Sequence, residues 1–72
     1  SNSVEMISID SSNIESVGYD EDSAILQVQF LNGSSYQYFD VPENIFNGLC
    51  NADSAGKYLS DMVKGNYRYS KV

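Results

Sequence analysis

The fold is decided by the stretch AILQVQFLNGSSYQYFDV, residues 24–41. Its first half alternates aliphatic or aromatic residues with glutamines, a period of two that is typical of a strand with one buried and one wet face. The dipeptide Asn32-Gly33 follows, and both residues tolerate the positive φ that a two-residue type I′ turn requires. Residues 34–41 then return as the partner strand. The stretch therefore predicts a β-hairpin.

The register of this hairpin decides which side chains face the core, since a slip of one residue moves every side chain to the opposite face. A two-residue loop places Leu26, Val28 and Phe30 on the core face. It also places Tyr36 and Tyr38 on the opposite, solvated face beside glutamines. A four-residue loop keeps this division, whereas a three-residue loop with a glycine bulge would put both tyrosines beside Val28 and Leu26. We expect the two-residue loop.

Two short helices are predicted after the hairpin. Pro42 suits a first helical position, where its missing N–H is not needed. Ser54 can cap a second helix, and Gly65 is well placed to end it. Each helix has an apolar stripe on one side. The first stripe comprises Ile45, Phe46, Leu49 and Cys50, and the second comprises Tyr58, Leu59, Met62 and Val63.

The remaining segments complete an α+β fold. Residues 13–19 predict a strand before the hairpin, and residues 1–12 predict an N-terminal tail or short edge strand. The tail of residues 66–72 either adds an edge strand or lies on the surface. We therefore expect one domain over residues 13–72: a three-stranded antiparallel meander, with an extra edge strand left open, and two C-terminal helices packed on one face.

The composition excludes several kinds of chemistry. The chain has 72 residues, no histidine and one cysteine, so serine–histidine and cysteine–histidine catalysis are ruled out. Cys50 lies on an apolar stripe and is expected to be a small buried hydrophobe. The consecutive Asp20, Glu21 and Asp22 lack the spaced ligands and turning glycine of a calcium loop. We expect no enzyme, no cofactor and no metal site.

The location is inferred from cysteine usage and hydropathy. A single cysteine cannot form an intramolecular disulfide, which favours a reducing, cytoplasmic compartment. No apolar run approaches the roughly 20 residues that span a bilayer, and no signal segment is visible. We expect no membrane association.

Charge is distributed unevenly along the chain. The net charge is −6, yet residues 1–56 contain nine acids and no Lys or Arg. All four basic residues lie in residues 57–72, against one acid. The overall field is expected to repel nucleic acid, while the C-terminal segment could attract it locally.

An ordered set of short motifs resembles a known family. The motifs are Gly18-Tyr19, Tyr36-Gln37-Tyr38, Val41-Pro42, Ser54-Ala55-Gly56-Lys57-Tyr58 and Tyr67. Together they resemble the KTSC domain, a short module found alone in bacterial and phage proteins and at the C-terminus of some lysyl-tRNA synthetases. The resemblance covers roughly residues 13–72. It implies a small binding module, with RNA binding suggested by the synthetase context.

The candidate ligand-binding residues are aromatic or basic. Tyr36 and Tyr38 could form a platform that stacks bases, although strand tyrosines also act as half-buried β-formers. Residues 67–71 interleave cations and aromatics as single-strand binders do, and the alternative is an edge strand whose charges deter aggregation. The full set is Tyr36, Tyr38, Lys57, Lys64, Tyr67, Arg68, Tyr69 and Lys71.

A second candidate is an anion site at the start of the second helix. Ser54, Gly56 and Lys57 surround backbone N–H groups that favour an anion. The alternative is that Ser54 is only a helix cap and that Gly56 only permits close packing.

Two partner classes stay open from the sequence. The first is RNA, single-stranded or tRNA-like, bound through the tyrosines and the C-terminal cations. The alternative is a protein-interaction or self-association module of bacterial or phage origin, which would use the face of glutamines and tyrosines.

Overall fold

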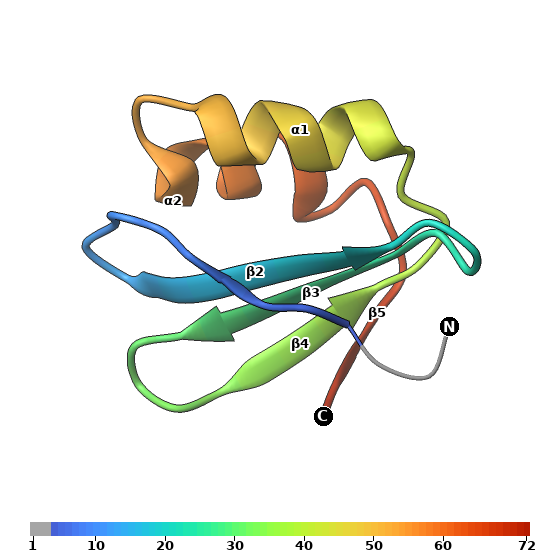
Figure 1. The fold of residues 1–72 in the computed structure, drawn as a ribbon, viewed down its shortest axis with the longest axis horizontal. Helices are drawn as coiled ribbons and strands as arrows, with labels where there is room; N and C mark the ends of the chain where they lie inside the picture. The colour runs from blue at the N-terminus through green and yellow to red at the C-terminus, as the bar shows by residue number, and fades with distance from the viewer. Residues whose placement is uncertain (1–3) are drawn as a thin grey trace.

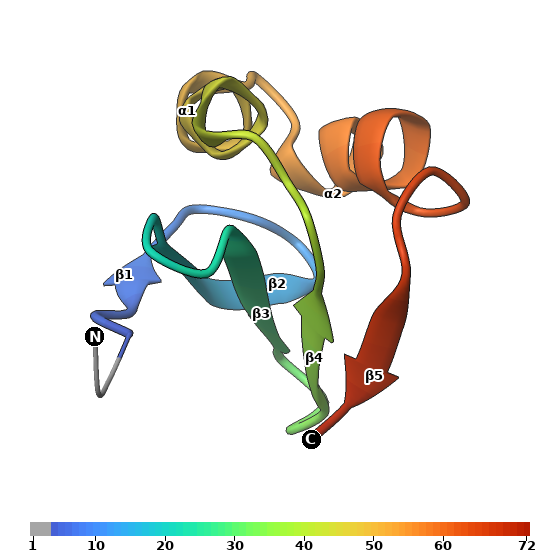
Figure 2. The same cartoon turned by 90° about the vertical axis from the view of Figure 1, so that its right-hand side faces the viewer.

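The computed structural model describes residues 4–72, in which helices cover one face of a five-stranded antiparallel sheet (Figure 1, Figure 2). The strands follow one another across the sheet in chain order, β1-β2-β3-β4-β5. The elements are β1 (Ile7–Ser8), β2 (Ile14–Asp20), β3 (Ile25–Phe30), β4 (Ser35–Tyr38), α1 (Glu43–Asn51), α2 (Ala55–Tyr58), the π-helical turn η1 (Leu59–Val63) and β5 (Tyr69–Lys71).

The predicted α+β class and one-sided helical layer are confirmed, with a larger sheet than expected. The central meander of β2, β3 and β4 is the predicted one. Both ends of the chain add an edge strand: β1 pairs with β2, and β5 pairs with β4. The predicted N-terminal segment of residues 1–12 is seen only from Val4 onward, because residues 1–3 lie outside the described part.

The β3–β4 hairpin differs from the expected two-residue turn. Its loop spans residues 31–33: the Phe30 N–H donates to the Ser34 carbonyl at 2.8 Å, and the Gly33 N–H donates to the Phe30 carbonyl at 3.0 Å. Gly33 has a φ of 93°, while Asn32 does not enter the positive-φ region. The Asn32 side chain instead accepts a hydrogen bond from the Ser34 N–H at 2.9 Å. This local bond favours a type I turn with a glycine bulge over a type I′ turn.

The extra loop residue reverses the expected orientation of β4. Tyr36 and Tyr38 pair with the core residues Val28 and Leu26, so both rings face the helices. Tyr38 is 3% exposed and Tyr36 is half-buried. The prediction that these tyrosines lie on the solvated face is therefore wrong. That face carries glutamines of β3 and β4 instead.

Helix α1 packs on the sheet through a narrower stripe than predicted. It begins one residue after Pro42, which occupies the N-cap position in extended backbone with ψ of 152°. Ile45 and Leu49 are buried, and Phe46 is half-buried. Cys50 is exposed, so its predicted burial is wrong. At 3.6 residues per turn Cys50 is rotated about 140° from Ile45, which takes it away from the sheet.

The second helix is capped as predicted but changes geometry. The Ser54 Oγ accepts a hydrogen bond from the Lys57 backbone N–H at 3.3 Å. Further along, the Lys64 N–H donates to the Leu59 carbonyl, five residues back, at 2.9 Å. This π-helical bond rotates the last turn relative to an α-helical stripe. Met62, predicted to be buried, is consequently 43% exposed.

The core fills the space between the sheet and the helices. It comprises Ile14, Val17, Leu26, Val28, Phe30, Tyr38, Val41, Ile45, Leu49, Ala55, Leu59 and Val63. Tyr36 packs against its margin, whereas Tyr69 on β5 is 63% exposed. Among residues 4–72 there is no helix with the length and apolar character needed to cross a bilayer.

Candidate functional site

Four aromatic rings form a continuous row at the margin of the core, on β3, β4 and β5. Phe30 meets Tyr36 edge to face, with centroids 5.8 Å apart and planes at 82°. Tyr36 lies 5.9 Å from Tyr69, and Tyr38 lies 6.0 Å from Tyr69. We call Phe30, Tyr36, Tyr38 and Tyr69 the aromatic row. Its buried members fix the positions of the more exposed Tyr36 and Tyr69.

Two lysines flank the half-buried Tyr36. The Lys64 Nζ lies over the Phe30 ring, 5.5 Å from its centroid. Lys71 is directly opposite Tyr36 across the β4–β5 pair, so the two side chains share a sheet face. Within the described residues 4–72, no ion pair involves either lysine. The exposed part of the aromatic row is therefore adjacent to two uncompensated positive charges.

The other two basic residues are compensated by carboxylates. The Lys57 Nζ lies 2.7 Å from Asp61 Oδ2, and the Arg68 Nη2 lies 3.3 Å from Asp40 Oδ2. The hydrogen bond that Lys57 donates to Asp61, followed by the negative charge of Asp61, raises the pKa of Lys57. Arg68 also lies over the Phe39 ring, 5.5 Å from its centroid. Both side chains are thus engaged away from the aromatic row.

The structure separates the predicted ligand-binding residues into two groups. Tyr36, Tyr38, Tyr69, Lys64 and Lys71 come together on the helix-facing side of β4 and β5. The remaining predicted residues lie elsewhere: Lys57 on α2, Tyr67 half-buried against the core, and Arg68 beside Phe39.

The predicted anion site has its groups engaged in other contacts. The Ser54 Oγ caps the short helix α2, and the Lys57 ammonium binds Asp61. A Cβ placed on Gly56 would lie 2.5 Å from Asn13 Oδ1, so this glycine allows a loop to pack closely on α2. Ser54, Gly56 and Lys57 are accounted for by capping and packing.

A pocket that sequence reasoning missed adjoins the aromatic row. It has a volume of about 460 Å³, and Phe30, Tyr36 and Lys64 form part of its wall. The β1–β2 loop and the β3–β4 turn close it at the same end of the molecule, where the Leu31 N–H donates to the Asn13 carbonyl at 2.9 Å. These loops are distant in sequence, and no local sequence pattern predicts that they are in contact.

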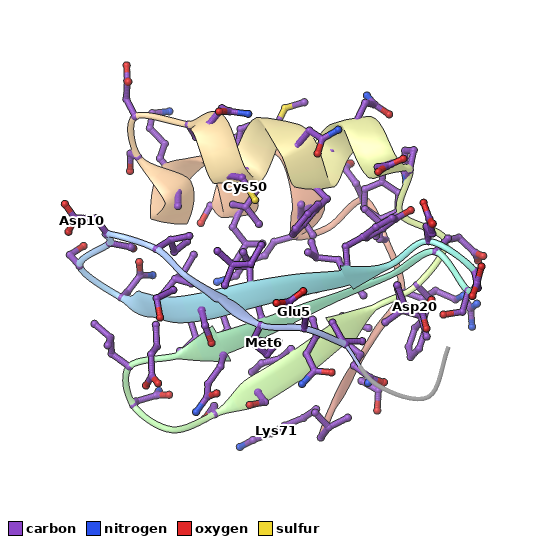
Figure 3. All side chains as sticks on the ribbon, viewed as in Figure 1. Glu5, Met6, Asp10, Asp20, Cys50 and Lys71 are labelled. Carbon is purple, nitrogen blue, oxygen red and sulfur yellow. The ribbon has the colours of Figure 1, made fainter. Side chains whose placement is uncertain are left out.

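A second aromatic cluster lies at the other end of β3 and has acidic neighbours. The rings of Tyr19 and Phe46 stack with centroids 5.3 Å apart and planes at 17°. The Tyr19 hydroxyl donates to the Val41 carbonyl at 2.5 Å. Burial, and then the charges of nearby carboxylates led by Glu43, raise the pKa of Tyr19. Figure 3 shows Asp20 at this end of the molecule.

The cysteine and the carboxylates are also candidates, as a nucleophile and as metal ligands. Cys50 is exposed, but partial desolvation by its neighbours raises the pKa of its thiol, which favours the protonated, weakly nucleophilic form near neutral pH. In the described part of the chain, histidine, cysteine, aspartate and glutamate side chains form no group of three or more that could hold a metal ion. The expectation of a chain without catalytic machinery remains a prediction.

Comparisons with known proteins give a consistent result. The family model of the KTSC domain matches residues 10–67. A protein of Tsukamurella paurometabola is 38% identical over 60 residues, which are 83% of this chain and 90% of that protein. A protein of Stutzerimonas stutzeri is 36% identical over 67 residues, with 92% and 94% of the two chains covered.

Two further comparisons extend this result. A segment of the lysine–tRNA ligase of Nostoc punctiforme is 30% identical over 59 residues, which are 82% of this chain but 10% of the ligase. The crystal structure of a KTSC domain protein from Yersinia pestis superimposes with a TM-score of 0.91 at 34% identity, covering 97% of this chain and 99% of that one. The chain therefore belongs to the KTSC domain family.

Proposed function

We propose that this chain is a non-catalytic module that binds RNA, single-stranded or tRNA-like, through the aromatic row with Lys64 and Lys71. One observation carries the proposal: the two basic side chains without a carboxylate partner in residues 4–72 are the two that flank Tyr36. A cation beside an exposed ring matches a nucleotide, which joins a negative phosphate to a planar base.

The exposed rings can supply the contact with bases. Tyr69 is 63% exposed, and Tyr36 is half-buried next to it. Stacking of a base on an aromatic side chain contributes about 1–3 kcal/mol and does not depend strongly on sequence. Lys64 and Lys71 can then contact the phosphates on either side of the stacked base.

The acidic remainder of the chain does not prevent such binding at moderate salt. The Debye length is about 10 Å at 0.1 M ionic strength. The chain extends 29 Å along its longest axis, so carboxylates at the far end are screened from a ligand on the aromatic row. The lysine–tRNA ligase relatives, which contain a segment similar to this chain, are consistent with an RNA ligand.

The alternative of a protein-interaction or self-association module receives less support. It was predicted to use glutamines and tyrosines on one face, but β4 places them on opposite faces of the sheet. On the face away from the helices the Gln37 Nε2 donates to Gln27 Oε1 at 3.1 Å, so these side chains partly satisfy each other. The predicted cytoplasmic location stays part of the RNA proposal.

The experiment is a titration of labelled oligouridylate and of a tRNA at several salt concentrations. Two phosphate contacts should give a slope of log K against log salt of about −1.4, at about 0.7 per contact for a single strand. Absence of binding at low salt, or binding without a salt slope, would refute the proposal. Sedimentation of the same sample distinguishes self-association, which would appear as a dimer without RNA.

A further inference from the structure

The pocket beside the aromatic row is built by two loops that meet at one end of the sheet. The β1–β2 loop contributes Asn13, and the β3–β4 turn contributes Asn32 and Ser34. In Figure 1 these loops lie at the same end of the molecule. The volume of about 460 Å³ falls within the range of small-ligand sites.

The walls of the pocket combine a ring surface with a positive charge. Phe30 and Tyr36 stand nearly perpendicular, at 82°, and Lys64 lies over Phe30. No carboxylate belongs to the part of the lining that the structure describes. In a chain with net charge −6, such a lining favours a planar ligand that carries an anionic group.

The orientation of the Asn32 amide is fixed by a backbone contact. Its Oδ1 accepts a hydrogen bond from the Ser34 N–H at 2.9 Å, and a backbone N–H can only donate. The Nδ2 group of Asn32 is therefore the end left to donate. No hydrogen bond within residues 4–72 uses this nitrogen.

The Asn13 amide is oriented by a similar argument. The Ser11 Oγ accepts from the backbone N–H groups of Asn13 and Ile14, at 3.2 and 3.1 Å. Its own hydrogen then donates to Asn13 Oδ1 at 3.0 Å. The close approach of Gly56 holds this amide against α2. Asn13 therefore also presents its Nδ2 group as a donor.

We infer that this pocket binds a uridine nucleotide unit, with the base against the aromatic wall and its phosphate on Lys64. The inference rests on the proposed RNA function and adds a base preference to it. Two amide donors suit uracil, whose two exocyclic groups are both carbonyl acceptors. In cytosine an amino group replaces the C4 carbonyl and would face an amide donor at that position, and adenine has no exocyclic carbonyl.

The test is a titration of the ¹⁵N-labelled chain, followed by ¹H–¹⁵N NMR, with uridine, cytidine and adenosine 5′-monophosphates and with inorganic phosphate. Uridine monophosphate should shift the backbone amides of Asn13, Asn32, Ser34 and Lys64 in a saturable way. We expect it to bind at least several-fold more tightly than cytidine monophosphate. Inorganic phosphate should affect Lys64 alone.

A matched pair of variants isolates the amide donor. Asn32→Asp keeps the oxygen that accepts from the Ser34 N–H but removes the Nδ2 donor, and it should weaken uridine monophosphate about tenfold. Asn44→Asp makes the same change of charge on the exposed start of α1, away from the pocket, and should leave the affinity unchanged. Equal losses in both variants would overturn the inference.

The outcomes separate the pocket from the RNA function. If oligouridylate shifts the amides of Lys64, Tyr69 and Lys71 while those of Asn13, Asn32 and Ser34 stay unmoved, the pocket inference is wrong and the RNA function stands. If uridine monophosphate fills the pocket but no oligonucleotide binds, the RNA function is wrong and the pocket stands. If all nucleotides and inorganic phosphate bind alike, the pocket does not recognise a base and the inference fails.

Discussion

The molecule has two aromatic clusters, and their charged neighbours have opposite signs. The Tyr19–Phe46 stack lies near the start of β3, whereas the aromatic row crosses the sheet from Phe30, at the end of β3, to Tyr38 and Tyr69. The Tyr19–Phe46 stack adjoins Glu43 and other carboxylates, whereas the aromatic row adjoins Lys64 and Lys71. Both clusters contain tyrosine and phenylalanine rings, so ring type cannot distinguish them as binding surfaces. The sign of the charges beside the rings does distinguish the two clusters. The net charge of the chain is −6, yet the charge beside the aromatic row is positive. The net charge therefore does not predict the charge of a particular surface.

The largest effect on RNA binding is expected from removing both lysines that flank the aromatic row. Lys64→Gln combined with Lys71→Gln should weaken oligouridylate binding about a hundredfold at low salt, since each charge-assisted contact contributes about 1.5–3 kcal/mol. Fluorescence anisotropy measures the change.

The matched control removes the other two cations. Lys57→Gln with Arg68→Gln takes the net charge from −6 to −8, as the first pair does, but affects side chains already paired with Asp61 and Asp40. It should retain nearly full affinity. Equal losses in the two double variants would mean that only the net charge matters.

A smaller effect is expected from replacing one aromatic ring in each cluster by leucine. Tyr69→Leu should reduce oligouridylate affinity about tenfold, through loss of one stacking contact of about 1–3 kcal/mol. Phe46→Leu disrupts the ring stack at the acidic end and should not change the affinity. Thermal unfolding of both variants checks that they are folded, and an equal effect of the two substitutions would contradict the assignment.

The two clusters should also differ in what their hydroxyl groups contribute to stability. Tyr19→Phe removes the hydrogen bond to the Val41 carbonyl and should lower the free energy of unfolding by about 1 kcal/mol. Tyr69→Phe, on an exposed side chain, should change it little. Urea unfolding monitored by circular dichroism compares them, and the opposite order would show that the Tyr19 bond does not contribute.

The ionisation of buried tyrosines at alkaline pH should also affect the stability of the chain. Burial raises the pKa of Tyr19 and of Tyr38, with further contributions from Glu43 at the first and from Tyr36 at the second. The unfolded chain then loses these phenolic protons first, at about pH 10. The contribution of these two phenols to the free energy of unfolding should therefore be level up to about pH 10 and fall as the pH rises further.

Salt should separate the two titrations. Burial is the main cause at both tyrosines, but the charges that add to it differ: carboxylates at Tyr19 and neighbouring phenols at Tyr38. Adding salt screens the carboxylates around Tyr19 and should lower its pKa more than that of Tyr38. Absorbance titrations of Tyr19→Phe and Tyr38→Phe measure the remaining phenols. An equal salt response at the two positions would contradict the assigned causes.

The smallest effect is expected from neutralising the acidic end. Glu21→Gln with Glu43→Gln should raise oligouridylate affinity by less than about twofold at physiological salt, where the Debye length is about 8 Å. β3 has six residues and so separates the acidic end from Phe30, over which Lys64 lies, by roughly 17 Å. A much larger increase in binding would show that the whole-molecule field, and not the local lysines, controls RNA affinity.

The sequence predicted the positions of the helices and strands better than it predicted which of their side chains face the core. Period-two alternation in β3 and the capping serine of α2 are local signals, and both were read correctly. The apolar stripe predicted for α1 was correct at Ile45 and Leu49 and wrong at Cys50. The hairpin register was not, because Asn32-Gly33 is compatible with a two-residue and a three-residue loop. A side-chain hydrogen bond within the turn decided between them, and β4 turned over as a result.

The candidate site was predicted in content and not in arrangement. Tyr36, Tyr69, Lys64 and Lys71 were all among the predicted ligand-binding residues, but on a different surface. Their assembly depends on β5 pairing with β4 and on the π-helical turn that positions Lys64. Both are long-range outcomes of packing. Phe30 was assigned only to the core, since a short alternating segment does not reveal which buried ring borders a pocket.

The hairpin loop also has an evolutionary consequence. Its length sets the phase of β4, so the spacing of aromatic residues after the turn is meaningful only together with the number of residues in the turn. A homologue that lost one of residues 31–33 would keep its rings over the core only if its Tyr-x-Tyr motif moved by one position. Insertions, deletions and tyrosine spacing should therefore change together among sequences of this family.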